Sequence, residues 1–222
     1  MTIFYLMTIW KIERKNMSKL YISDLHLFHK NVTKAGRDFD GRPYKDLDEM
    51  HEDILKRWNS KATNADHVYV IGDMVWKVNS ENRDEVMSLL KSMNGCIHLI
   101  QGNHDRIHTP VFRTRFEEIV PYKRIEDVEH GNNRDVILSH YYMPFYDKHR
   151  YGSILLHGHS HDTEESEMEV KITNYLNENG FLVNAYNVGC MKPYMDYTPR
   201  TLEEIIDRYE EHTNGKNRKR VS

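Results

Sequence analysis

The sequence has little cysteine and little net charge. Only two cysteines, Cys96 and Cys190, occur among 222 residues, and they do not form a Cys-X-X-Cys pair. A disulfide framework and a thiolate-ligated structural zinc site are therefore not expected. One disulfide is an alternative to two reduced thiols in a cytosolic protein. The formal net charge is -3, so no overall basic field favours stable binding to duplex nucleic acid.

Long apolar runs are also absent. The apolar stretch near the N-terminus, residues 3–10, is too short to span a bilayer, and its basic residues follow the stretch rather than precede it. We therefore expect a cytoplasmic protein without a membrane partner, and we interpret residues 1–16 as a non-functional N-terminal extension. No internal repeat or linker divides the remainder, which predicts one domain over residues 17–213 and a basic, disordered tail over residues 214–222.

Apolar spacing along this domain alternates between strand and helix patterns. Short apolar runs at residues 20–23, 68–71 and 97–100 predict buried strands. Helical spacing predicts one helix over residues 46–59 and another around residues 86–93. This alternation is typical of a layered α/β domain.

The second half of the chain gives a different pattern. Closely spaced apolar runs after Val128 suggest a second, more antiparallel sheet, and the acidic residues 162–169 suggest a solvated loop. Thr201 and Glu204 form a capping-box pattern, which predicts that a C-terminal helix begins there.

Five short clusters contain most of the residues that could bind a metal. They are Asp24-Leu25-His26, Gly72-Asp73, Gly102-Asn103-His104-Asp105, His140 and Gly158-His159-Ser160-His161. Most of them directly follow a predicted strand. Carboxylate, imidazole and amide donors suit hard or borderline divalent cations. Seven such ligands are enough for two cations around one shared carboxylate, an arrangement that holds both the attacking and the leaving oxygen of a displacement at phosphorus.

Local spacing suggests how these ligands are used. Asp24 and His26 are two residues apart, so on an extended segment both side chains would face the same side, and His159 and His161 repeat this spacing. Asp73 follows a glycine turn and could bridge two ions through its two oxygens. The neutral amide of Asn103 would keep the site from becoming too negative to hold a phosphate.

The ordered set D-x-H, G-D, G-N-H-D, H, G-H-x-H resembles the calcineurin-like metallophosphoesterase superfamily, from about Met17 to about Asp207. The flanking residues 21–23, 139–141 and 187–189 are similar to those of its small bacterial and phage members. The resemblance implies the four-layer α/β/β/α sandwich of that superfamily, with two mixed sheets flanked by helices. We expect two divalent ions per chain, Mn²⁺ or Fe, with Zn²⁺ able to substitute.

The resemblance also implies roles for individual residues. The first metal would be bound by Asp24, His26, Asp73 and His161. The second would be bound by Asp73, Asn103, His140 and His159. A metal-bridging hydroxide would attack phosphorus. His104 matches the histidine of the superfamily that is not a ligand, and we expect it to donate a proton to the leaving oxygen.

Two positions depart from the protein serine/threonine phosphatases of the superfamily. Those enzymes have an aspartate three residues after the bridging aspartate and a glutamate after Gly-Asn-His, whereas this sequence has Trp76 and Asp105. The carboxylate that would orient His104 is therefore not where those enzymes place it. Protein dephosphorylation becomes a less favoured function, and Asp105 is closer to the nucleotide phosphodiesterases and nucleotidases.

Candidate substrate-binding residues lie on loops beside the clusters. They are His29, Arg42, Tyr141, His149 and Arg150. Arg42 could clamp a phosphate or could be a solvated loop charge. The aromatic residues 141–151 follow His140, so they could overhang the site and stack on a base, or could pack on the core.

We therefore expect a two-metal phosphodiesterase acting on a small, nucleotide-like phosphoester. Three alternatives stay open: a phosphomonoesterase, a nuclease on single-stranded nucleic acid, and a metal-stabilised scaffold without activity. The sequence does not separate the first alternative from the leading hypothesis, because the same two-metal centre serves both reactions.

Overall fold

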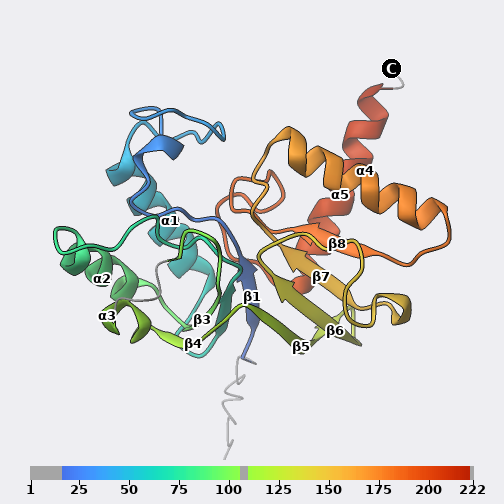
Figure 1. Ribbon diagram of the computed structural model, residues 1–222, viewed down its shortest axis with the longest axis horizontal. Coiled ribbons are helices and arrows are strands. Elements are labelled where there is room, and N and C mark those ends of the chain that lie inside the picture. Colours follow the sequence, from blue (N-terminus) through green and yellow to red (C-terminus); the bar gives the residue numbers. More distant parts are fainter. Residues whose placement is uncertain (1–16, 106–109, 221–222) are drawn as a thin grey trace, which may run out of the picture.

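The computed structural model describes residues 17–105 and 110–220 (Figure 1). Its strands are β1 (Lys19–Ile22), β2 (His67–Val70), β3 (Cys96–Ile100), β4 (Phe116–Val120), β5 (Tyr122–Glu129), β6 (Asn132–Ser139), β7 (Ile154–His157) and β8 (Asn184–Asn187). Its helices are α1 (Leu47–Lys61), α2 (Arg83–Ser92), α3 (Pro110–Arg113), α4 (Glu164–Glu178) and α5 (Leu202–Arg220), with single 3₁₀ turns η1 (Lys30–Val32) and η2 (His149–Tyr151).

The first sheet has the strand order β1-β2-β3-β4, and all of its neighbours pair in parallel. The three predicted apolar runs form β1 to β3, whose side chains are almost all buried. Helix α1 begins where expected, because the Asp46 carboxylate accepts a hydrogen bond from Glu49 N at 3.0 Å. Helices α1, α2 and α3 lie beside this sheet (Figure 1).

The second sheet has the order β5-β6-β7-β8 and is mixed. Strands β5 and β6 pair antiparallel, whereas β6, β7 and β8 pair in parallel. Helices α4 and α5 lie beside this second sheet, in the half of the molecule away from α1, α2 and α3 (Figure 1). The molecule is therefore the expected α/β/β/α sandwich, although its first sheet is wholly parallel rather than mixed.

Two predictions about the C-terminal half were wrong. The acidic segment 162–169 is not a loop throughout, because α4 begins at Glu164 with three glutamates in its first turn, where negative charge favours a helix. Ser166 is the only residue of α4 that is buried, so the helix has little apolar periodicity to reveal it. Helix α5 starts at the predicted capping box but continues through Arg220, so the tail is helical rather than disordered up to that residue. The predicted extension, residues 1–16, lies outside the described residues.

Two further features of the described residues are the state of the cysteines and the character of the helices. Cys96 and Cys190 are both free thiols, so the single disulfide does not form. Within residues 17–105 and 110–220, no helix combines the length and the apolar character needed to cross a bilayer.

The carboxyl ends of the strands in the two sheets meet near Ser23. Ser23 N donates to Val188 O, and Cys190 N donates to Ser23 O, both at 2.9 Å, which joins the end of β1 to the segment after β8. Strands β1, β2 and β3 run parallel in one sheet, and β6, β7 and β8 run parallel in the other. The loops that follow them are therefore brought to one edge of the sandwich, as expected for the ligand-binding edge of parallel strands.

Candidate metal centre

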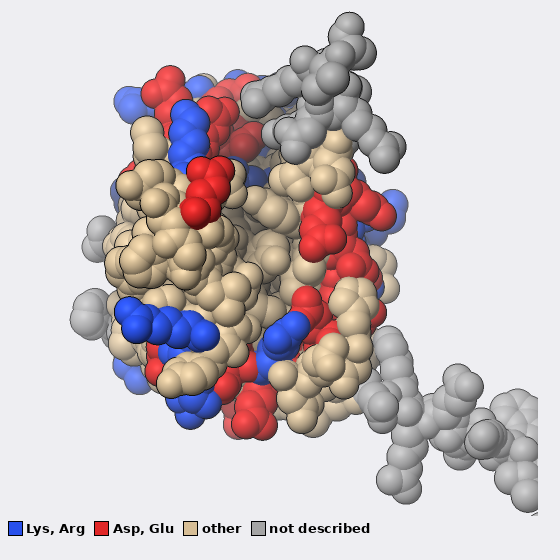
Figure 2. Space-filling view, turned by 90° about the vertical axis from the view of Figure 1, so that its right-hand side faces the viewer, with Lys and Arg blue, Asp and Glu red and all other residues tan. Residues whose placement is uncertain are grey.

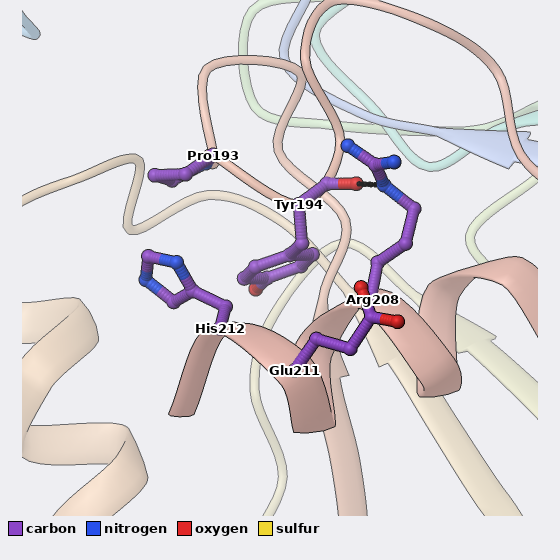
Figure 3. A pocket seen from close by; sticks show the side chains of 5 residues that line it. All are labelled: Pro193, Tyr194, Arg208, Glu211 and His212. Carbon is purple, nitrogen blue, oxygen red and sulfur yellow. Dashed lines mark hydrogen bonds between the residues drawn. The ribbon is translucent and has the colours of Figure 1, made fainter. Parts of the chain in front are cut away.

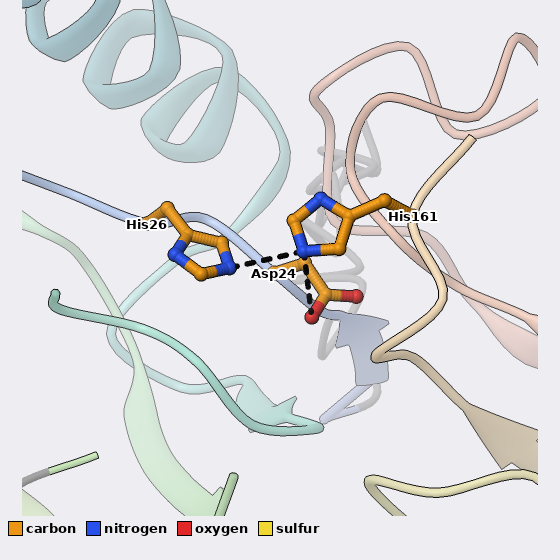
Figure 4. Close-up of side chains that lie close together, drawn as sticks. All are labelled: Asp24, His26 and His161. Carbon is orange, nitrogen blue, oxygen red and sulfur yellow. Dashed lines mark hydrogen bonds and ion pairs between the residues drawn. The ribbon is translucent and has the colours of Figure 1, made fainter. Parts of the chain in front are cut away.

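The first group of predicted ligands lies at the end of β1 and in the loop after β7. Asp24, His26 and His161 are buried, and one ligand atom from each lies within 4.8 Å of the others. The Nε2 atoms of His26 and His161 are 3.1 Å apart, and Nε2 of His161 is 4.0 Å from an Asp24 oxygen (Figure 4). These are the ligands expected to bind the first metal together with Asp73.

The second group lies at the ends of β1, β2 and β6, and Asn103 after β3 and His159 after β7 lie beside it. Asp24, Asp73 and His140 form a second set of buried ligand atoms within 4.8 Å of one another. Asn103 Oδ1 lies 3.0 Å from His140 Nε2 and 3.0 Å from His159 Nδ1. The structure thus brings together all four residues expected at the second metal.

Asp73 belongs to the second group and also faces the first, whereas Asp24 belongs to both groups. Its Oδ2 atom is 3.5 Å from Nε2 of His26 and 3.5 Å from Nε2 of His140. One carboxylate oxygen therefore faces histidines of both groups, which is the position required of a shared ligand.

The outward nitrogens of three histidines already have partners. Nδ1 of His140 lies 3.0 Å from Ile71 O, Nδ1 of His161 lies 2.9 Å from Asp40 Oδ2, and Nδ1 of His26 lies 3.3 Å from Nδ1 of His29. A carbonyl or carboxylate at Nδ1 fixes the proton there and leaves the lone pair on Nε2, which points into the shared space. The donor set therefore fits divalent cations.

Charge in the centre also favours a cation. Burial alone would lower the pKa of His140, but the hydrogen bond to Asp73 and the charges of Asp24 and Asp73 outweigh it and raise the pKa to about 9, so a metal ion would displace a proton from Nε2 of His140 on binding. Burial lowers the pKa of His26 well below its ordinary value, with His161 as the next cause, so its imidazole is neutral and able to bind a metal.

Five of the seven predicted ligands have left-handed backbone conformations. The φ angles are 56° at Asp24, 48° at His26, 53° at Asp73, 71° at His159 and 52° at His161. Such angles are uncommon outside glycine and concentrate at functional sites. The expectation that Asp24 and His26 lie on an extended segment was therefore wrong: they are brought together by tight turns, and His159 and His161 contact different groups.

Glycines in the clusters allow close approach of neighbouring segments. A Cβ atom at Gly158 would lie 2.0 Å from Ser23 Oγ, and one at Gly102 would lie 2.3 Å from Asp73 Oδ1. The glycine that begins three of the five clusters, Gly72, Gly102 or Gly158, is thus required by packing around the centre.

Asp105 holds the backbone around Asp73, the proposed bridging ligand. Its two oxygens accept hydrogen bonds from the backbone N–H groups of Gly102, Asp73 and Met74 at 2.8 to 3.0 Å. Burial raises the pKa of Asp105 to about 6, an effect that these hydrogen bonds oppose. The residue orients the loops after β2 and β3 and does not belong to either ligand group found among the described residues.

Arg42 does not have either of its expected roles. It is fully buried, and its guanidinium donates to Asp24 O and Leu25 O at 2.8 Å and pairs with Asp40. Because its polar hydrogens are used inside the protein, Arg42 is neither a phosphate clamp nor a solvated charge. It fixes the turn that carries Asp24.

His29 also differs from the expectation. The side chain is 6% exposed and stacks on Trp76 with ring centroids 3.6 Å apart. It lies beneath Trp76 and against His26, so direct substrate contact is not the role that its position supports.

The aromatic segment 141–151 approaches the centre only at its first residue. Tyr141 is 49% exposed and makes edge contacts with the rings of His140 and His159. Farther along, Lys148 Nζ pairs with Asp135 Oδ2 at 2.8 Å. Asp135 lies on β6 five residues before His140, so the two residues are roughly 16 Å apart along the strand. His149 and Arg150 follow Lys148 on η2, and their substrate contacts stay a prediction.

Sequence reasoning missed Asp40 and the role of Trp76. Asp40 accepts from His161 and is held by Arg42, while Trp76 contacts His104 at a centroid distance of 4.2 Å. Neither belongs to a cluster motif. The only available signal was their position on loops next to the clusters.

A separate pocket of ≈ 290 Å³ lies beside helix α5 and is lined by Pro193, Tyr194, Arg208, Glu211 and His212 (Figure 3). Arg208 Nε donates to Tyr194 O at 2.7 Å across its wall. None of the predicted site residues lines it, so it is not part of the metal centre.

Comparisons with known proteins agree with this geometry. The family model for calcineurin-like phosphoesterases matches residues 17–189. An uncharacterized protein, MJ1445, of Methanocaldococcus jannaschii is 36% identical over 92 residues, which are 41% of this chain and 49% of that protein. The Gene 66 protein of Mycobacterium phage L5 is 28% identical over 164 residues, which are 64% of this chain and 76% of that protein. The chain thus spans about half the length of the first relative and three quarters of the second.

A solved structure shares the fold. The protein of unknown function AQ665 from Aquifex aeolicus has a TM-score of 0.63 and 24% identity, with 86% of this chain and 99% of that chain covered. Family members hydrolyse phosphoesters with a dinuclear divalent metal centre, and the buried ligand groups around Asp73 are candidates for it. The chain belongs to the calcineurin-like phosphoesterase family.

Proposed function

We propose that this chain is a two-metal phosphodiesterase that hydrolyses a small, nucleotide-like ester, with Mn²⁺ or Fe as its resident ions and Zn²⁺ as a possible substitute. The observation that carries the proposal is the position of Asp73 Oδ2, 3.5 Å from Nε2 of both His26 and His140. When bound there, two divalent ions would activate a water and neutralise charge on the phosphoryl oxygens.

The residues of the chain would supply the remaining chemistry. Asp24, His26 and His161 hold one side of the centre, and Asn103, His140 and His159 hold the other. His104 follows Asn103 and is partly exposed beside His26, with ring centroids 5.5 Å apart. This position supports a role for His104 as the proton donor to the leaving oxygen rather than as a ligand.

Aromatic side chains on both sides of the centre support a diester substrate. Phe39 is 46% exposed and contacts the rings of His26 and His161, whereas Tyr141 contacts the rings of His140 and His159. A diester has two organic groups and can use both contacts, whereas a monoester has one. A phosphomonoesterase is the second candidate, because the metal ligands suit either substrate.

A nuclease is supported less well. On the face shown in Figure 2, Lys and Arg side chains are scattered among Asp and Glu and form no continuous basic surface. The formal net charge of -3 likewise gives no overall basic field for nucleic acid. We therefore propose a small phosphoester as the partner, without stable duplex binding. The free thiols Cys96 and Cys190 are in keeping with a cytoplasmic location.

A substrate panel with Mn²⁺ tests this function. Bis-p-nitrophenyl phosphate should be hydrolysed with a higher kcat/KM than p-nitrophenyl phosphate or single-stranded DNA, and His104→Ala should lose roughly 10²–10⁴-fold on esters with poor leaving groups. The loss should shrink for p-nitrophenolate, which departs without a proton. A preference for the monoester would contradict the diester assignment, and loss of metal from the variant would show that His104 is a ligand.

A further inference from the structure

Among residues 17–105 and 110–220, the ring of His104 contacts a tryptophan and hydrogen-bonds to no carboxylate. Its backbone N–H donates to Asp73 Oδ1 at 2.8 Å, which fixes the main chain. Its ring contacts, within the described residues, are with Trp76 at 4.2 Å and His26 at 5.5 Å between centroids. The side chain next to the His104 ring is therefore an indole.

Trp76 is itself held on several sides. One face stacks on His29 with an interplanar angle of 2°, and Nζ of Lys77 lies over the ring at 5.7 Å from its centroid. Its backbone N–H donates to Leu27 O at 3.0 Å. Because one face stacks on His29 and the backbone is fixed, Trp76 is better suited to hold a neighbouring ring than to stack on a substrate.

His29 connects this indole to a metal ligand. The Nδ1 atoms of His29 and His26 are 3.3 Å apart, so one of them donates a proton to the other. Where His29 accepts from His26 Nδ1–H, Nε2 of His26 is left free to face Asp73.

We propose that Trp76 is a positioning residue: supported by His29, its indole holds the imidazole of His104 toward the leaving oxygen in place of a carboxylate. Its kinetic consequences rest on the proposed function, whereas the contact between Trp76 and His104 does not. An indole cannot accept a hydrogen bond from His104, so its effect is to restrict the orientation of the ring. Restricting that orientation should increase turnover without changing the affinity for substrate.

Kinetics with two esters test this role. The substrates are methyl phenyl phosphate, which has the poorer leaving group, and methyl p-nitrophenyl phosphate. With Mn²⁺, Trp76→Ala should lower kcat on the phenyl ester on the order of tenfold and have less effect on the p-nitrophenyl ester, with KM and metal content unchanged. Trp76→Phe keeps an aromatic ring and should recover most of the loss. Phe145→Ala, which removes an exposed aromatic side chain packed on Phe181, is the matched control and should not change the ratio of the two rates.

A double-mutant cycle and a spectrum of the metal-free chain complete the test. If Trp76 acts through His104, Trp76→Ala should slow His104→Ala no further. In carbon-edited spectra of the histidine rings, the His104 signal of metal-free protein should move toward its exposed value in Trp76→Ala and less so in Trp76→Phe. An equal loss on both esters, independent effects in the cycle or an unchanged His104 signal would overturn the proposal. Should the wild type hydrolyse neither ester, the proposed function fails, and the spectrum alone decides the positioning role.

Discussion

At the scale of single residues, the centre is built from side chains on strained backbone. His159 has a φ of 71° and is only partly buried, so both its strain and its ligand role can be tested without disturbing the core. A left-handed conformation costs an L-residue roughly 1–2 kcal/mol, whereas glycine adopts it freely. The ligands keep these angles because the surrounding turns and the close packing at Gly158 fix the backbone conformation.

Two substitutions at His159 separate these effects. Both His159→Gly and His159→Ala remove a ligand and should weaken metal binding similarly. In metal-free protein, His159→Gly should have a free energy of unfolding about 1 kcal/mol higher than His159→Ala, because only glycine relieves the strain. Urea unfolding of the two variants checks this. Equal stabilities would show that the backbone at His159 is not strained.

Asp73 and Asp105 should respond differently to the same change. Asp73→Asn weakens the shared ligand and should abolish turnover with little effect on folding. Asp105→Asn replaces one accepting oxygen by a donor next to backbone N–H groups, so it should lower the free energy of unfolding by about 1–3 kcal/mol while keeping both metals. Elemental analysis and urea unfolding of both variants distinguish the two roles. Similar losses of metal from both would mean that Asp105 is also a ligand.

At the scale of elements, helix α1 contains a histidine whose protonation should affect stability. His51 Nε2 accepts a hydrogen bond from Phe28 N at 3.0 Å. Burial lowers the pKa of His51 from 6.5 to about 4, an effect that the charge of Asp48 opposes. Between these pH values the unfolded chain binds a proton at His51 and the folded chain does not. The contribution of neutral His51 to the free energy of unfolding is therefore complete above pH 6.5 and is lost as the pH falls toward 4.

The substitution His51→Gln should reduce this pH dependence, because the amide oxygen can still accept from Phe28 N and does not titrate. Urea midpoints at pH 7 and pH 5 should differ less in the variant than in the wild type. His130→Gln is the control with the opposite sign. The charges of Asp207 and Glu203 outweigh desolvation and raise the pKa of His130, so its contribution is present at low pH and its removal should enlarge the difference. A larger difference in His51→Gln would contradict the account.

The elements that the sequence predicted are those with apolar periodicity or a specific capping residue. Strands β1 to β3 and helix α1 have buried apolar faces, and α5 begins at the Thr201 capping box. Helix α4 was missed because it buries almost nothing, and the extent of α5 was missed because polar residues continue it without a stop signal. Motifs identified the ligand clusters, but not the tertiary partners Asp40 and Trp76, since nothing local links Asp40 to His161 or Trp76 to His104.

At the scale of the whole molecule, the centre joins the two halves of the sandwich. Asp24, His26, Asp73 and Asn103 follow strands of the first sheet, whereas His140, His159 and His161 follow strands of the second. Each ligand group contains residues from both sheets. Ions that bind only the folded chain should therefore stabilise the packing of one sheet on the other, by about 2.7 kcal/mol for each ion at a free concentration one hundred times its Kd.

The most direct test of the central claim is anomalous diffraction at the manganese edge from crystals of the full chain grown with Mn²⁺. Two peaks are expected, one near Asp24, His26 and His161 and the other near Asn103, His140 and His159, with Asp73 Oδ2 between them and a separation of about 3.5–4 Å. A single peak at this edge of the sandwich, or peaks only at the exposed cluster of His130, Glu203 and Asp207, would contradict it.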